Sequence, residues 1–353
     1  IGVFKFFENR FPTQSISLFA AANFCAFFGV FAAVSFDYHS NVIAACLVPW
    51  FFYHIEKENN ILSLVFFILI LISKENVSFW MTFVCLGLLI EHFKNRKLRK
   101  ALLFYTVGSF VYFILIIKVV MPAISNAGAY PHFHYSTLGH DFGEAFIYLI
   151  SHPIDAVTTF FTNHTDHPHG DYVKLETHVL LLISGLPFLF FKPQYLIMII
   201  PVYFQKMFHD NHLMWGIGGQ YSIEFAPILA IGIFMVLAQL KSKKKRRITS
   251  FIVLTLTIAA TIRSMDNTVL YTNKAALRFY QADHYKRDYD VAALHKKLNE
   301  IPENAVISAQ SPFLPHLSLR DDIYLFPTIK DAEYIIFAPD ENPYPITKEE
   351  LQK

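Results

Sequence analysis

The chain has 353 residues, of which 54% are hydrophobic and only 16% are charged, and its mean hydropathy is +0.36. A soluble domain carries about 25% charged residues, so this composition excludes an ordinary soluble protein. The excess apolar side chains are expected to face lipid. The formal charge of +2 is too balanced for a nucleic-acid binder. Cys25, Cys46 and Cys85 fall within apolar runs, which excludes a disulfide framework and a thiolate metal site.

Apolar segments long enough to cross or enter a bilayer recur along the first three quarters of the chain. A spanning helix needs about 20 apolar residues, fewer where helices tilt or the bilayer thins. We therefore predict an all-α, multi-pass integral membrane protein with about nine transmembrane helices. The segments are 14–35, 41–55, 61–73, 77–92, 101–121, 176–191, 194–208, 220–240 and 248–266.

Two basic runs orient these segments. Residues 94–100 and 241–247 are rich in Lys and Arg, and such runs collect on the cytoplasmic side. This orientation predicts a multi-pass protein of the plasma (inner) membrane. Its outer face then carries the turns near residues 37 and 74, a long loop over 122–175 and the tail after about 267. Most of the histidines share that face, although an outer loop is also simply polar.

The long outer loop and the tail have their own patterns. Residues 142–161 predict an amphipathic helix, interrupted or restarted at Pro153, that lies in the membrane interface or packs on the other helices. The tail is charged and lacks a spanning segment, so we divide the chain into a membrane domain (1–266) and a small extracytoplasmic α/β domain (267–353). A helix at 283–300 and strands at 305–309, 323–326 and 334–337 are predicted there.

Several short motifs, in order along nearly the whole chain, resemble one family. It is the predicted-membrane-protein family known as domain of unknown function 2079. The motifs are Ser35-Phe36-Asp37-Tyr38-His39, Ser73-Lys74-Glu75-Asn76, Lys118-Val119-Val120-Met121-Pro122, Ser151-His152-Pro153, Gln220-Tyr221, Pro315-His316-Leu317-Ser318 and Ile323-Tyr324-Leu325-Phe326-Pro327.

That family looks like a branch of the GT-C superfamily of multi-pass glycosyltransferases. The resemblance implies transfer of a sugar from a polyprenyl-phosphate donor at the outer membrane face, with membrane lipids as partners and no nucleic acid. In such enzymes the activating acid lies in the first outer loop. The chain begins at Ile1 without a signal peptide, so we expect that an upstream portion carries this acid.

Sugar transfer needs a base for the acceptor hydroxyl and positive charge for the leaving phosphate. Asp37, His39 and Glu75 are our candidate catalytic residues, and Asp37 with His39 is compatible with a divalent metal. Asp37 is equally suited to capping the following helix, and Glu75 to neutralising Lys74. The candidate substrate-binding residues are Lys74, Lys118, Lys206 and Tyr221, with snorkelling as the alternative for the lysines.

Two further groups of side chains stand out in the outer loop. His164, His167 and His169 are interleaved with Asp166 and Asp171, but they match no defined zinc pattern. The aromatic run 130–135 offers a stacking surface for a sugar or isoprenoid, or an interface anchor.

Two other functions stay open. One is a lipid or solute transporter or flippase: an ion-coupled carrier is disfavoured because no predicted span carries a charge at its centre, whereas a lipid flippase could use a polar groove. A non-catalytic membrane scaffold that presents its tail to a partner is the other alternative.

Overall fold

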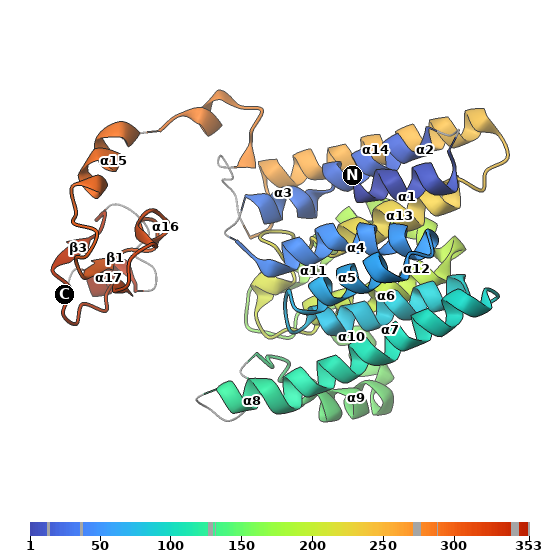
Figure 1. The fold of residues 1–353 in the computed structure, drawn as a ribbon, viewed down its shortest axis with the longest axis horizontal. Helices are drawn as coiled ribbons and strands as arrows, with labels where there is room; N and C mark the ends of the chain where they lie inside the picture. The colour runs from blue at the N-terminus through green and yellow to red at the C-terminus, as the bar shows by residue number, and fades with distance from the viewer. Residues whose placement is uncertain are drawn as a thin grey trace. The chain divides into compact units, whose positions relative to one another are not determined.

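The computed structural model describes residues 1–12, 15–35, 38–125, 130, 132–270, 277–287, 289–339 and 346–351. The chain is mostly helical and forms two compact units, Ile1–His284 and Tyr285–Lys353 (Figure 1). The helices of the first unit are α1 (Gly2–Arg10), α2 (Ile16–Ala26), α3 (Phe28–Val34), α4 (Ser40–Glu56), α5 (Asn60–Leu71), α6 (Val77–Glu91), α7 (Arg96–Leu115), a π turn (Ile116–Val120), α8 (Met121–Ile124), α9 (Phe142–Ser151), α10 (Pro153–Phe161), α11 (Gly170–Ile183), a 3-10 helix (Leu186–Phe191), α12 (Pro193–Met207), a 3-10 turn (His212–Met214), α13 (Phe225–Leu237) and α14 (Lys243–Asp266), and a 3-10 turn (Ala282–Tyr285) crosses the unit boundary.

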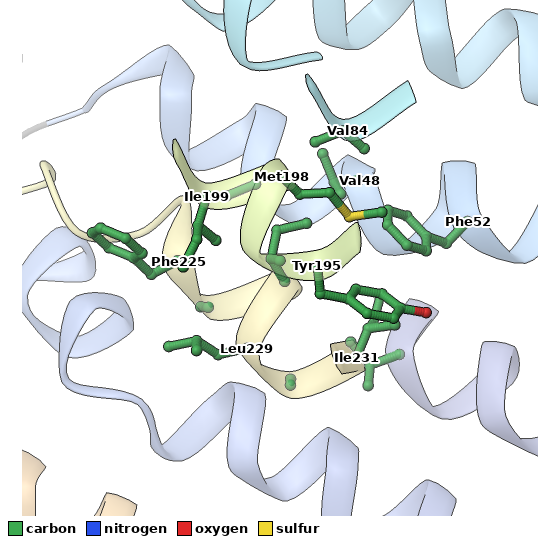
Figure 2. Packing of buried hydrophobic residues seen from close by; sticks show 14 of the residues in the cluster. Val48, Phe52, Val84, Tyr195, Met198, Ile199, Phe225, Leu229 and Ile231 are labelled. Carbon is green, nitrogen blue, oxygen red and sulfur yellow. The ribbon is translucent and has the colours of Figure 1, made fainter. Parts of the chain in front are cut away.

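Helix α13 is the centre of the first unit. Every residue of α13 except Val236 is buried, as expected for a helix that is apolar on all sides. Figure 2 shows Phe225, Leu229 and Ile231 of α13 packed among side chains of the neighbouring helices, Tyr195 of α12 among them. Gly232 permits this close packing, because a Cβ there would lie 2.5 Å from a methyl carbon of Leu189.

The prediction of about nine spanning helices is not confirmed. Among the described residues, two helices are long and apolar enough to cross a bilayer, Arg96–Ile124 and Lys243–Asp266. A third is added if α2 and α3, which meet at a 49° bend, count as one span. The other apolar segments form helices of 17 residues or fewer. Segment 176–191 is divided at Gly185, whose φ of 101° ends α11 before the 3-10 helix.

Ion pairs tie four helical segments together at the end of the bundle near the basic runs. Glu91 of α6 accepts from Arg10 at 3.1 Å and from Lys192, just before α12, at 3.2 Å. Arg10 also pairs with Glu56 of α4, and Gln194 donates to Glu91. These groups are mostly buried, so the carboxylates depend on their cationic partners.

Helices α9 and α10 confirm the predicted interruption at Pro153. Helix α9 ends at Ser151, and α10 begins at Pro153. Each helix buries one residue, whereas Ile150 and Ile154 are 65% and 79% exposed. Such an exposed apolar surface fits a helix that lies in the membrane interface.

The second unit contains α15 (Val291–Asn299), α16 (Leu314–Leu317), α17 (Lys348–Leu351) and three short strands, β1 (Ile307–Ala309), β2 (Ile323–Leu325) and β3 (Tyr334–Ile336). The strands form a parallel sheet in the order β2-β1-β3. Leu298, Ile307 and Leu317 belong to its small core. The unit begins at Tyr285, later than the predicted boundary at 267, since Phe279 stacks on Phe31 of the first unit.

Candidate functional site

The polar groups of interest lie at the end of the bundle opposite the basic runs, where the chain connects α5 to α6 and enters α4 and α13. Lys74, Glu75 and Asn76 form the α5–α6 connection, and all three are half-buried. Asn76 donates through Nδ2 to Gln205 Oε1 of α12 at 3.1 Å. This bond fixes the connection against the bundle.

Glu75 contacts Tyr130 of the long loop 122–175. The Tyr130 hydroxyl donates to Glu75 Oε1 at 3.5 Å, at the long limit of a hydrogen bond. Burial and the Glu75 carboxylate raise the pKa of Tyr130 well above its usual range, so the phenol stays protonated and remains a donor. His132 meets the Tyr130 ring edge-on at 5.7 Å. The structure thus joins two features that the sequence indicates separately, a carboxylate and an aromatic surface.

A second polar cluster is more deeply buried. Asn41, at the start of α4, donates through Nδ2 to Glu224 Oε1 at 2.9 Å and to the Gln220 carbonyl at 3.2 Å. Glu224 immediately precedes α13, where the positive end of the helix dipole favours a carboxylate. Asn41 and Gln220 are 2% and 1% exposed. Lys74 and Lys206 both interact electrostatically with Glu224.

Sequence reasoning missed the pairing of Asn41 with Glu224. The available signal was weak: a polar segment, Gln220 to Glu224, directly precedes a wholly apolar helix. Nothing in the local pattern indicates that its partner is an asparagine 183 positions earlier.

The three candidate lysines occupy different environments. Lys206 is 2% exposed, and its ammonium donates to the carbonyls of Met214 and Gly216 at 2.8 Å each. Lys118, in the π turn after α7, is half-exposed and pairs with Asp141 at 3.0 Å. Lys74 lies at the α5–α6 connection beside Glu75.

A further buried lysine contacts the segment between α12 and α13 to which Lys206 donates. Lys174 of α11 is fully buried, donates to the Thr162 carbonyl at 2.8 Å, and lies 4.5 Å from the centre of the Trp215 ring. The carbonyl of Trp215 accepts from the Thr177 hydroxyl at 2.6 Å. Lys174 and Lys206 therefore position the segment between α12 and α13, which ends at Glu224.

The remaining sequence candidates are placed as follows. Asp37 lies outside the described residues, and His39 is half-buried just before α4. Tyr221 is half-buried between the buried Gln220 and Ser222.

The histidine-rich segment does not assemble a metal site among the residues that the structure describes. No group of three or more His, Cys, Asp or Glu side chains there is arranged to hold a metal ion. Instead, the ring of His167 stacks on that of His212 with their centres 3.8 Å apart, and His164 Nδ1 accepts from the Lys174 ammonium at 3.0 Å.

Comparison with known proteins gives one match. The model of the family described as predicted membrane protein, domain of unknown function 2079 (DUF2079), matches residues 3–344. No curated protein and no solved structure matches the chain.

Proposed function

The chain belongs to this family of predicted membrane proteins, and from that premise we propose that it transfers a sugar from a polyprenyl-phosphate donor to an acceptor hydroxyl. The observation that carries the proposal is the contact of Glu75 with Tyr130 beside Lys74. A carboxylate, an aromatic surface and a cation are what a sugar-phosphate reaction requires of a protein. We place this site at the extracytoplasmic face of the plasma (inner) membrane, with the second unit on the same side.

In the proposed reaction, Glu75 accepts the proton of the acceptor hydroxyl. The acceptor oxygen then bonds to the anomeric carbon of the sugar, and the bond from that carbon to the phosphate oxygen breaks. The polyprenyl phosphate leaves with the bonding electron pair, and Lys74 and Lys118 stabilise its negative charge. Asp37 and His39 are the alternative base, with a divalent metal as an optional cofactor of that pair.

Tyr130 positions the base in this scheme. Its phenol is a permanent donor to Glu75, which leaves the second carboxylate oxygen for the acceptor hydroxyl. The aromatic ring offers a face for the sugar, as aromatic side chains with one polar end commonly do.

The test uses the full chain in lipid nanodiscs, supplied with tritium-labelled polyprenyl-phosphate hexoses and pentoses. Release of label from the lipid phase measures transfer to an added acceptor or to water. Glu75→Gln should reduce the rate by about 100-fold or more, the usual contribution of a general base. Glu58→Gln is the matched control, because Glu58 is an exposed carboxylate paired with Lys97 near the basic runs.

Two results would contradict the proposal. One is transfer at the normal rate by folded Glu75→Gln, which would remove Glu75 from the reaction. The other is the absence of label release from every donor by a protein that binds none of them, which would remove the polyprenyl-phosphate donor itself.

A further inference from the structure

The buried cluster at the start of α4 and α13 contains four oxygen atoms that no described part of the chain satisfies. Asn41 Oδ1, Gln220 Oε1, Ser222 Oγ and Glu224 Oε2 are inaccessible to solvent and have no hydrogen-bond partner among the described residues. Each such group costs about 1–3 kcal/mol when it is buried unpaired, and a carboxylate oxygen costs more. A set of this size in one place calls for an explanation, and a bound ion or water is a common one.

Two hydrogen bonds bring Asn41, Gln220 and Glu224 into contact. Asn41 Nδ2 bonds both to Glu224 Oε1 and to the backbone of Gln220. Its Oδ1 is attached to the same carbon as Nδ2, so it lies beside the same two residues. Ser222 sits between Gln220 and Glu224 in sequence and is 1% exposed.

The unsatisfied atoms are mainly acceptors, which narrows the class of ligand. The Ser222 hydroxyl can donate to one of the other three oxygens, which leaves two acceptors without a donor while Glu224 is ionised. The nearby ammonium of Lys206 does not fill the set, because it donates to Met214 and Gly216. A metal cation accepts several oxygen ligands at once and needs no donor from the protein.

A broken helix lies against the cluster. Helix α2 ends at Ala26, Phe27 is extended, and α3 begins at Phe28 with a 49° change in direction. Gly29 of α3 lies so close to the Ser222 carbonyl that a Cβ there would be 2.4 Å from its oxygen. In membrane proteins, helix interruptions of this kind supply backbone carbonyls to bound cations.

We propose that Asn41, Gln220 and Glu224 bind a monovalent metal cation of the size of Na⁺ beside the α2–α3 break. Glu224 is the one carboxylate among these residues, and the positive charges of Lys74 and Lys206 interact with it, so a monovalent cation is opposed less than a divalent one. The proposal does not depend on sugar transfer.

The test measures the thermal unfolding of the purified full chain in nanodiscs. NaCl is titrated against N-methyl-D-glucamine chloride at constant ionic strength, with KCl, MgCl₂ and CaCl₂ as further probes. A saturable rise in Tm with Na⁺ is expected, of about 5 °C once the concentration reaches 100 times Kd.

Two glutamine variants give a matched comparison. Gln220→Leu should abolish the Na⁺-dependent rise, because it removes one ligand. Gln205→Leu should retain it, since Gln205 Oε1 is already engaged by Asn76. Asn41→Asp keeps Oδ1 but replaces the Nδ2 donor by a carboxylate oxygen facing Glu224, so the variant should be less stable without Na⁺ and should show a larger Na⁺-dependent rise in Tm.

The proposal is overturned if the Tm is identical in Na⁺ and N-methyl-D-glucamine over the whole titration. It is equally overturned if Gln220→Leu retains the full shift, or if only Mg²⁺ and Ca²⁺ produce one. If Gln220→Leu does not fold, the response of wild-type protein and of Asn41→Asp decides.

Discussion

The side-chain amide of Asn41 donates to the carboxylate of Glu224 at 2.9 Å across 183 positions of sequence. The bond joins the first turn of α4 to the start of the buried central helix α13. It therefore sets how a peripheral helix meets the core at the end of the bundle that holds the candidate site.

Replacing Asn41 by Ala should lower the free energy of unfolding by about 2–3 kcal/mol, because both oxygens of a buried carboxylate then lack a donor. The change is read from the Tm of the purified protein. Asn76→Ala is the control: its amide bonds the neutral Gln205 side chain at the surface of the bundle, so about 1 kcal/mol is expected. Equal losses in the two variants would show that the charge of Glu224 adds nothing.

Substitutions of Lys118 and Lys206 should distinguish a lysine that stabilises the fold from one that binds the headgroup of the lipid donor. Lys206→Met leaves two buried carbonyls without a donor and should destabilise the protein by about 2–4 kcal/mol. Lys118→Met removes an exposed ion pair and should cost less than about 1 kcal/mol. In the nanodisc transfer assay, Lys118→Met should instead lower kcat, because the leaving phosphate loses a cation, and raise the KM for the lipid donor. An unchanged KM would exclude Lys118 from donor binding.

The free energy of unfolding should decrease as the pH is lowered, because protonation of His209 is unfavourable in the folded protein. Burial, with the charges of His134 and His164, lowers the pKa of His209 to about 4, while Asp210 opposes the shift. The neutral ring is required, since Nδ1 accepts from the Asn211 amide at 2.9 Å.

An unfolded histidine titrates near 6.5, so the unfolded state binds more protons between the two values. Stability is therefore complete above about pH 6.5, falls by about 2–3 kcal/mol toward pH 4, and changes no further through this group below that. Tm measured from pH 4 to 8 gives the slope, and His209→Gln should flatten it. A variant with the wild-type slope would assign the effect to other groups.

The ion-pair network near the basic runs should be sensitive to Glu91. Glu91→Gln leaves Arg10 and Lys192 without their shared carboxylate in a largely buried setting, so a loss of about 3–5 kcal/mol is expected. Glu58→Gln, which breaks the exposed pair with Lys97, should change stability by less than about 1 kcal/mol. Unfolding of both variants by heat in detergent provides the comparison. A Glu91→Gln protein as stable as the control would show that the network contributes little.

The sequence predicts the parts of this fold that depend on local pattern. Long apolar runs locate α7 and α14, and Pro153 locates the boundary between α9 and α10. The shorter apolar runs are ambiguous, because hydropathy does not distinguish a full span from a short helix that ends at a residue such as Gly185.

The candidate site depends on contacts between distant residues, which a single sequence does not reveal. Glu75 and Tyr130 stand out individually, but their contact across the outer loop does not follow from either motif. Lys206 is at the predicted helix end, yet its ammonium is buried on backbone carbonyls. From the sequence alone, such a lysine is expected to bind lipid headgroups, because the sequence does not reveal that the segment after α12 folds back over the helix end.

The unequal lengths of adjacent helices bear on the lipid around the protein. Helix α5 has 12 residues and rises about 18 Å, whereas the continuous helix from Arg96 to Ile124 has 29 residues and rises about 43 Å. Both present exposed apolar side chains, such as Ile68 and Val107. A bilayer core is about 30 Å thick, so the long helix can cross it with both ends in water, whereas α5 ends within it. Lipid beside α5 would therefore meet the polar connections at its ends, where lipid beside the long helix meets apolar side chains.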